Sequence, residues 1–280
     1  MANEWEWELQ AEKKWFQYGL VELWRCRGLL QSFVRKELTA GYQQTIMGVF
    51  WLVIQPLLTT LFYFLVFSKI VKVSTDGAPP LLFYMSGALL WGYFSDCFTS
   101  TMYSFLHNAH IFNKVYFPRL IVPLSMVITH SVRTGIQFIL FLIIYVNYWI
   151  FDDAVHPSSY IWLMPFMLFF TALLGLGLGM IVAVFMAKYR DLEQLMNFML
   201  RLFMFVTPVV YPASIVPEKY KVLFWCNPLT PVIETFRLGF LHGGSVDSIY
   251  IFTGMASSLL VFFIGLTLFK FREIKVMDTI

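Results

Sequence analysis

The chain alternates between long apolar runs and short polar connections. Six runs are each long enough to form a helix that crosses the hydrocarbon core of a bilayer, which takes about 20 residues. The runs cover residues 47–68, 81–106, 120–151, 160–187, 192–211 and 248–269. This pattern predicts an all-α integral membrane protein with six transmembrane helices, preceded by a cytoplasmic segment over residues 1–46.

Two other apolar segments do not fit a simple span. Residues 20–38 carry an imperfect apolar stripe at helical spacing, with charged residues elsewhere around the helix, which is typical of a helix in the membrane interface. The alternative is an ordinary helix packed on the protein. The stripe consists of Leu23, Cys26, Leu30 and Phe33. Residues 222–242 are interrupted by Pro228 and Pro231, so we expect one or two short helices dipping in from the outer face.

The composition agrees with lipid as the solvent for much of the surface. Hydrophobic residues make up 59% of the chain and charged residues 13%, and the mean hydropathy is +0.68. A soluble domain has about 25% charged residues. Cys26, Cys97 and Cys226 lie far apart on the predicted topology, so we expect free thiols. The first residues lack the short apolar core of a signal peptide.

The positions of Lys and Arg predict the orientation of the spans. With a cytoplasmic N-terminus, 13 of the 20 basic residues fall in inner segments and five in outer segments. Cytoplasmic connections are the ones enriched in Lys and Arg. The sequence therefore predicts that both termini are cytoplasmic.

The other two basic residues, Arg133 and Arg201, fall inside apolar runs. At 1.5 Å per residue they lie about 21 Å and about 15 Å from the inner ends of their helices. Ionisable groups at that depth are costly and are often functional. Either they line a path for an anionic group such as a lipid diphosphate, or they pair internally, Arg133 with Asp96 and Arg201 with a helix C-terminus.

Motifs for enzymatic chemistry are missing from the sequence. No phosphate-binding GxxxxGK[ST] segment, metal-type histidine spacing, paired carboxylates or nucleophile elbow occurs. Gly175, Gly177 and Gly179 superficially resemble a dinucleotide turn but sit within an apolar run, which favours close helix packing through Gly175 and Gly179. These observations argue against an intramembrane transferase, and a channel has little support.

Two features favour transport. The chain holds 30 Phe, 14 Tyr and 9 Trp, and a minority of these rings would suit the apolar faces of sugars along a channel. The short inner connection HNAHIFNKVYFPR presents a compact polar surface to a cytosolic partner.

Several stretches together resemble the permease subunit of type-2 ABC exporters of polysaccharide, with O-antigen exporters the most similar group. They are VRKELTAGYQQTIMGVFWLVIQPLL (34–58), NAHIFNKVYFPRLIVPLS (108–125), KYRDLEQLMNFMLRLFMFVTPVVYPASIVPEKYK running into FWCNPLTPVIETFRLGFL (188–241), and the ending FKFREIKVMDTI. The resemblance implies a six-helix ABC-2 domain over residues 47–280, with periplasmic gate helices at about 215–242.

The resemblance also implies roles for particular residues. The ATPase-coupling surface would comprise Asn108, His110, Phe112, Asn113, Lys114, Tyr116 and Arg119, with a second contact at Arg190 and Asp191. The amphipathic helix would act as a gate for substrate entry, with Arg35, Glu37 and Tyr42 near the cytoplasmic entrance. Candidates for the glycan path are Trp51, Tyr63, Trp91, Arg201, Phe205 and Tyr211.

The sequence thus predicts the membrane subunit of an exporter that moves a polyprenyl-diphosphate-linked polysaccharide across the bacterial inner membrane. By resemblance, it would act as a homodimer with two cytosolic ATPase subunits that bind ATP and magnesium, and this chain itself would bind no cofactor and no nucleic acid. The alternatives are an ABC-2 exporter of teichoic acid, capsule, or a small lipid or drug.

Overall fold

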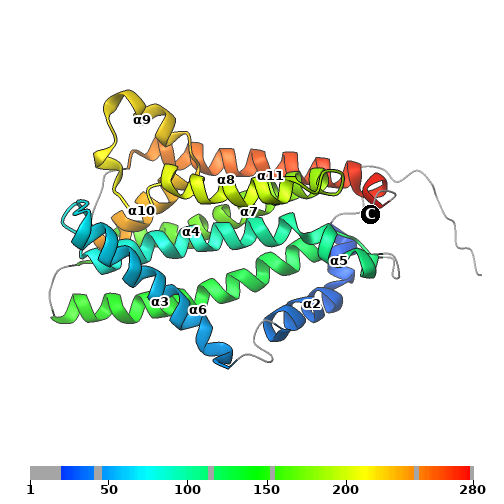
Figure 1. Cartoon of the computed structure of the whole chain (residues 1–280), viewed down its shortest axis with the longest axis horizontal. Coiled ribbons are helices and arrows are strands. Elements are labelled where there is room, and N and C mark those ends of the chain that lie inside the picture. The colour runs from blue at the N-terminus through cyan, green and yellow to red at the C-terminus, as the bar shows by residue number, and fades with distance from the viewer. Residues whose placement is uncertain (1–19, 41–45, 113–116, 152–154, 243–245, 278–280) are drawn as a thin grey trace, which may run out of the picture.

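The computed structural model describes residues 20–40, 46–112, 117–151, 155–242 and 246–277, and all of the secondary structure in these ranges is helical. The longer helices form an elongated bundle (Figure 1). In chain order the elements are α1 (Leu20–Arg25), α2 (Arg27–Ala40), η1 (Gly48–Phe50), α3 (Trp51–Tyr63), η2 (Phe64–Ile70), α4 (Pro80–Met102), α5 (Ser104–Phe112), α6 (Ile121–Phe151), η3 (Ser159–Leu163), α7 (Met164–Met186), α8 (Leu192–Val206), η4 (Ala213–Ile215), α9 (Glu218–Trp225), α10 (Leu229–Leu241) and α11 (Ser248–Met277).

Within the described residues, four helical stretches are long and apolar enough to cross a membrane. They are Gly48–Ile70, Ile121–Phe151, Ser159–Met186 and Ser248–Arg272. They agree closely with the first, third, fourth and sixth apolar runs of the sequence. The prediction of an all-helical membrane protein with several apolar helices is therefore confirmed.

The second and fifth predicted spans do not meet this description. The helix α4 has 23 residues, but Asp96 and several small polar residues lower its hydropathy, and it bends at Tyr103 into α5. The helix α8 has 15 residues, about 22 Å at 1.5 Å per residue, because the chain turns at Thr207. Both lie alongside the four apolar helices (Figure 1), and the count of six stays a prediction.

The glycines of α7 bring three helix backbones into close contact. A Cβ atom on Gly175 would lie 2.8 Å from the Cβ of Cys97, and one on Gly179 would lie 2.8 Å from the carbonyl oxygen of Phe98, both on α4. Gly177 faces α11, where a Cβ on Gly265 would lie 2.3 Å from the Gly177 carbonyl oxygen. The predicted packing role of Gly175 and Gly179 is confirmed, and α4, α7 and α11 form the central layer.

The amphipathic helix α2 packs on α6. Phe33 is buried in a cluster with Phe117, and Leu23, Cys26 and Leu30 pack against the same cluster, while Arg35 faces outward. The apolar stripe therefore packs on the protein, as in the alternative of an ordinary packed helix, and a place in the membrane interface stays a prediction.

The Pro-interrupted outer segment forms two short helices, α9 and α10, and their dipping in from the outer face stays a prediction. The helix α10 is almost completely buried and adds Phe236 and Phe240 to a cluster of rings with Phe138, Phe141 and Tyr145 of α6. The three cysteines are unpaired, as expected.

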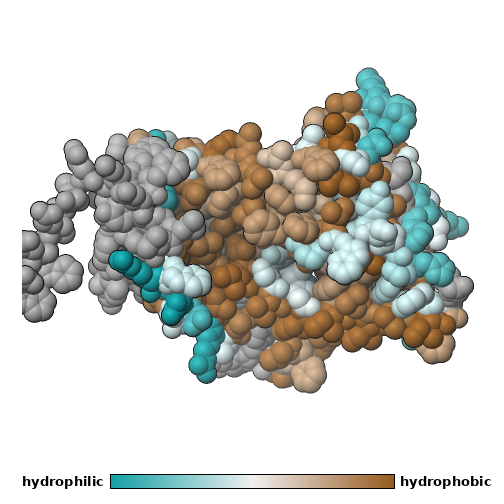
Figure 2. All heavy atoms as spheres, turned by 180° about the vertical axis from the view of Figure 1, so that it is seen from behind, coloured by the Kyte–Doolittle hydropathy of each residue, from teal (hydrophilic) through white to brown (hydrophobic). Residues whose placement is uncertain are grey.

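The two ends of the bundle differ from its middle. The helices α2 and α5 and the C-terminal end of α11 lie at one end, and α9 and α10 lie at the other (Figure 1). Figure 2 shows apolar surface over the middle of the molecule and hydrophilic atoms where α9 projects. Such an apolar middle with polar ends is the distribution that a bilayer requires.

Because α7 and α11 approach so closely, a single methyl group added between them should lower the stability of the protein. Replacing Gly265 by Ala forces the new Cβ against the backbone of Gly177, and overpacking of this kind costs about 1–3 kcal/mol. The melting temperature of the purified protein in detergent should fall by several degrees. Gly135→Ala on α6, where a Cβ meets nothing within 4 Å, is the matched control and should not lower it. Equal melting temperatures for the two variants would contradict this packing.

Candidate functional site

A cavity of about 430 Å³ opens between α3, α4 and α6, in the apolar middle of the bundle. Its wall mixes aromatic rings with amides, hydroxyl groups and two charged side chains. The lining residues from α3 are Trp51, Leu52, Gln55, Pro56, Thr59, Thr60 and Tyr63, and those from α4 and α6 include Trp91, Asp96, Arg133 and Gln137. So many polar groups at this depth are costly unless they serve a substrate or each other.

The charged part of the cavity is built by α4 and α6. Arg133 and Asp96 both line it. Arg133 also reaches α2, where its Nη2 donates to the carbonyl oxygen of Glu37 at 3.3 Å. Behind Asp96, His130 lies with Nδ1 3.8 Å from the Asp96 carboxylate and Nε2 in hydrogen-bond contact with Ser100. Arg133 therefore connects the cavity with the end of the amphipathic helix.

One hydroxyl group in the cavity wall has no protein partner among the described residues. Thr60 is only 1% exposed, and its Oγ1 makes no hydrogen bond to any described residue. A buried hydroxyl left unsatisfied costs about 1–3 kcal/mol. The oxygen itself is inaccessible from the cavity in this conformation, so the polar groups open to a ligand are those of exposed wall residues such as Gln55 and Asp96.

Three of the predicted glycan-path residues meet at this cavity. Trp51, Tyr63 and Trp91 all line it, and the Tyr63 hydroxyl donates to the sulfur of Met204 on α8. The other three lie on or just after α8. Arg201 and Phe205 are exposed, and the Tyr211 hydroxyl donates to the carbonyl oxygen of Phe205 at 2.9 Å. The structure thus divides the six candidates into a cavity group and an α8 group.

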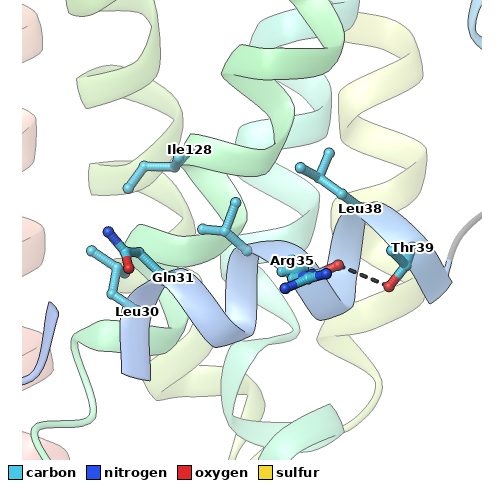
Figure 3. Close-up of a pocket in the computed structure, with 7 residues that line it drawn as sticks. Leu30, Gln31, Arg35, Leu38, Thr39 and Ile128 are labelled. Atoms are coloured by element: carbon cyan, nitrogen blue, oxygen red, sulfur yellow. Dashed lines mark hydrogen bonds between the residues drawn. The ribbon is translucent and has the colours of Figure 1, made fainter. Parts of the chain in front are cut away.

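A second, apolar groove of about 380 Å³ lies between α2 and α6 (Figure 3). Leu30, Val34 and Leu38 of α2 face Ile128 of α6 across it. Arg35 lies beside these leucines, and its carbonyl oxygen accepts a hydrogen bond from Thr39 Oγ1 at 2.8 Å (Figure 3). Of the predicted entry residues, Arg35 therefore lines this groove, and the Glu37 carbonyl contacts Arg133 in the wall of the cavity. Tyr42 lies outside the described residues.

The helix α5, which carries the first of the predicted ATPase-coupling residues, lies at the same end of the bundle as α2 (Figure 1). The segment begins as the helix α5, in which Asn108 is buried and donates to the carbonyl oxygen of Ser104 at 3.1 Å, so its side chain faces inward. Arg190 and Asp191 are exposed before α8. Arg119 is described. The other predicted residues, or their side chains, lie outside the described part of the chain: His110, Phe112, Asn113, Lys114 and Tyr116.

Tyr103 connects the start of α5 with α8. Its hydroxyl donates to Glu193 Oε1 at 3.1 Å and accepts a hydrogen bond from Asn197 Nδ2 at 2.9 Å. Its ring stacks on His107 of α5, with centroids 4.9 Å apart. Tyr103 therefore ties the start of α5 to α8, the helix whose Met204 contacts Tyr63 in the cavity.

A buried ion pair holds the opposite end together. Arg237 of α10 is 1% exposed and donates to Glu234 Oε1 at 3.1 Å. It also donates to the carbonyl oxygens of Tyr211 and Val209, in the turn after α8, and its guanidinium lies 3.6 Å from the ring centre of Phe83 on α4. One cation thus joins α10, α4 and the turn after α8.

Comparison with known proteins identifies the family of this chain. The sequence pattern of the ABC-2 type transporter family matches residues 28–241. The chain belongs to the ABC-2 type transporter family. It is 28% identical over 249 residues to the O-antigen export system permease protein RfbA of Klebsiella pneumoniae, covering 86% of this chain and 91% of that protein.

Two further relatives align with a similar share of this ABC-2 chain. The RfbA permease of Myxococcus xanthus is 25% identical over 261 residues, which is 92% of this chain and 98% of that protein. The polysialic acid transport protein KpsM of Escherichia coli is 20% identical over 246 residues, 87% of this chain and 93% of that protein. The resemblance to polysaccharide-export permeases is therefore confirmed along most of the ABC-2 chain.

Sequence reasoning missed two parts of the ABC-2 site. The polar side chains Gln55, Thr59, Thr60 and Gln137 lie within apolar runs, and only the packing of α3 against α4 and α6 gathers them. Arg237 was assigned to an outer connection, whereas it is buried. The i, i+3 spacing of Glu234 and Arg237 is the one signal that points to their pairing.

The buried pair predicts a large loss of stability for this ABC-2 chain when its cation is removed. Arg237→Met leaves Glu234 buried without its counter-charge and two carbonyl oxygens without a donor, so we expect a loss of about 3–5 kcal/mol or failure to fold. Lys221→Met, which breaks the exposed pair with Glu218 at the same spacing, should cost less than about 1 kcal/mol. Thermal unfolding in detergent measures both, and similar losses in the two variants would contradict the role assigned to Arg237.

Proposed function

We propose that this chain is the membrane subunit of an ATP-driven exporter that carries a polyprenyl-diphosphate-linked polysaccharide, similar to O-antigen, across the bacterial inner membrane. The observation that carries the proposal is the polar, aromatic cavity between α3, α4 and α6 in a chain of the ABC-2 family. Its rings offer apolar faces to sugars, and its amides and hydroxyls offer hydrogen bonds at their rims.

The lipid-linked end of the substrate would enter at the amphipathic helix. Arg35 is exposed beside the apolar groove between α2 and α6, which suits an anionic headgroup with a hydrocarbon tail. Arg133 lies farther in and is bonded to the end of the same helix through the Glu37 carbonyl. Two arginines at successive depths would draw a diphosphate from the inner leaflet toward the cavity.

Six spans with both termini in the cytoplasm account best for the placement of the chain ends. The helices α2 and α5 and the end of α11 share one end of the bundle, which requires an even number of crossings (Figure 1). The helices α4 and α8 would complete the set, with their polar positions covered by protein. The excess of Lys and Arg in the inner connections supports the same orientation.

Energy would come from a separate cytosolic ATPase, two copies of which would bind ATP and magnesium. Its contact would be residues 108–119, helped by Arg190 and Asp191, with Tyr103 passing the movement to α8. ATP closure would shift the chain between two arrangements only as far as the ATPase binds them with different affinity.

A second copy of the chain would cover α3 and α8. None of the 15 residues of α8, all of them described, is buried within the single chain, and Phe198, Leu202 and Phe205 are exposed beside Arg201. Lipid would solvate these apolar side chains but not the neighbouring cation, whereas a second protomer accommodates both. The glycan path would then run along the dimer interface.

The proposal is tested by complementing a strain from which the gene has been deleted. The deletion strain should keep lipid-linked glycan in the inner leaflet, and the wild-type gene should restore surface glycan. Arg133→Gln should lower surface glycan at least tenfold, because the cavity loses the cation that holds the anionic headgroup. The measurement is surface glycan per copy of protein in the membrane.

Arg25→Gln, an exposed cation on α1 outside the cavity, is the matched control and should export normally. Unchanged surface glycan in the deletion strain would contradict the proposed function. Normal export by Arg133→Gln with a lowered melting temperature would show that Arg133 is only structural.

A further inference from the structure

A separate cavity of about 340 Å³ lies at the end of the bundle formed by α9 and α10. Four segments far apart in sequence build its wall: the connection between η2 and α4, the turn at η4, the end of α9 with α10, and the start of α11. The described lining residues are Asp76, Ala213, Ser214, Lys221, Trp225, Glu234, Asp247 and Tyr250. Among described residues it shares none with the cavity between α3, α4 and α6.

Two parallel rings form the aromatic part of this outer cavity. Trp225 closes α9 and Tyr250 belongs to the first turn of α11, and their ring centroids lie 4.6 Å apart at an angle of 15°. Both are half-buried, so the pair is stacked and still open to the cavity. Paired rings of this kind present a rigid apolar edge and face with hydrogen-bonding groups at the rim.

Two of the carboxylates, those of Asp76 and Glu234, are held in place by contacts within the protein. Asp76 has a left-handed backbone with φ of 52° and accepts a hydrogen bond from Ser214 Oγ at 2.9 Å, which ties the connection before α4 to η4. Glu234 is fixed by Arg237 and accepts from the backbone N–H of Ala213 at 3.3 Å. The wall is therefore positioned before any ligand arrives.

This chemistry fits a sugar better than a metal ion. Among the residues that the structure describes, no group of three or more His, Cys, Asp or Glu lies close enough to hold a metal. A wall of stacked rings, carboxylate acceptors and an ammonium donor matches the alternating apolar faces and hydroxyl rims of a pyranose. Glu234 is already paired with Arg237, and the other two carboxylates, Asp76 and Asp247, still outnumber the Lys221 ammonium. This balance favours neutral or amino-bearing sugars and disfavours those that carry a carboxylate.

We propose that the cavity formed by Asp76, Ser214, Lys221, Trp225, Asp247 and Tyr250 binds a neutral or amino-bearing sugar unit of the glycan as it leaves the transporter. The assignment of this end to the outer face, and of a glycan as the ligand, rests on the proposed function. The site would hold the emerging chain weakly and so oppose its return.

The test uses the full-length protein, copurified with its ATPase in detergent. The probe is an oligosaccharide released by mild acid from the surface glycan of the strain that carries the gene. Saturation-transfer NMR and titration should detect binding to the wild type. Trp225→Ala and Asp247→Asn should each weaken it at least fivefold, and Asn retains the ability to cap the start of α11.

Leu223→Ala, an exposed position on α9 outside the cavity, is the matched control and should bind as the wild type does. A disaccharide containing a uronic acid should bind more weakly than its neutral counterpart. Lack of binding to the wild type, equal binding by Trp225→Ala and Asp247→Asn, or preference for the acidic sugar would overturn the outer site. The proposed function fails separately, if the deletion strain displays normal surface glycan.

Discussion

The close approach of α7 to α4 and α11 is the constraint on which the architecture depends. Helices in lipid gain little from hydrophobic association, so they pack through small residues that let backbones touch. The glycines of α7 provide this on two sides at once, Gly175 and Gly179 toward α4 and Gly177 toward Gly265 of α11. The resulting layer is rigid, and α3 and α8 can remain loosely packed against it without loss of the fold. A rigid layer beside loosely held helices is suited to a protein that must open and close.

The two ends of this layer are fixed by different chemistry. At the end with α10, one guanidinium reaches Glu234, two backbone carbonyls and the ring of Phe83, so the elements around it hold together as a unit. At the end with α2, an apolar cluster around Phe33 and Phe117 is joined by neutral or singly charged hydrogen bonds: Arg133 to the Glu37 carbonyl, and Tyr103 to Glu193 and Asn197. Substrate entry and coupling to an ATPase both belong there in the proposed function.

Much of this organisation is predictable from sequence because apolar runs and helical periodicity report directly on lipid and on packing. The packing of Gly175 and Gly179 was predicted and is confirmed, and helices are present at the apolar stripe from Leu23 to Phe33 and in the broken outer segment. The placement of those two segments at the membrane faces stays a prediction. The early end of α8 at Val206 was missed, since the residues beyond it are as apolar as those before. The cavity was missed in part because Gln55, Thr60 and Gln137 come together only through tertiary contacts. Burial of Arg237 was missed for the same reason, since its carbonyl partners are 26 and 28 residues away.

The central claim is that the cavity between α3, α4 and α6 lies on a path along which a separate ATPase drives a lipid-linked glycan. The most direct measurement places the copurified permease and ATPase in proteoliposomes that hold the lipid-linked glycan in the leaflet facing the ATPase. Periodate or a lectin on the other side then reports the glycan that has crossed. The account predicts crossing that requires ATP and stops when the ATPase is inactivated. Crossing at the same rate without ATP, or ATP hydrolysis with no glycan reaching the far side, would contradict it.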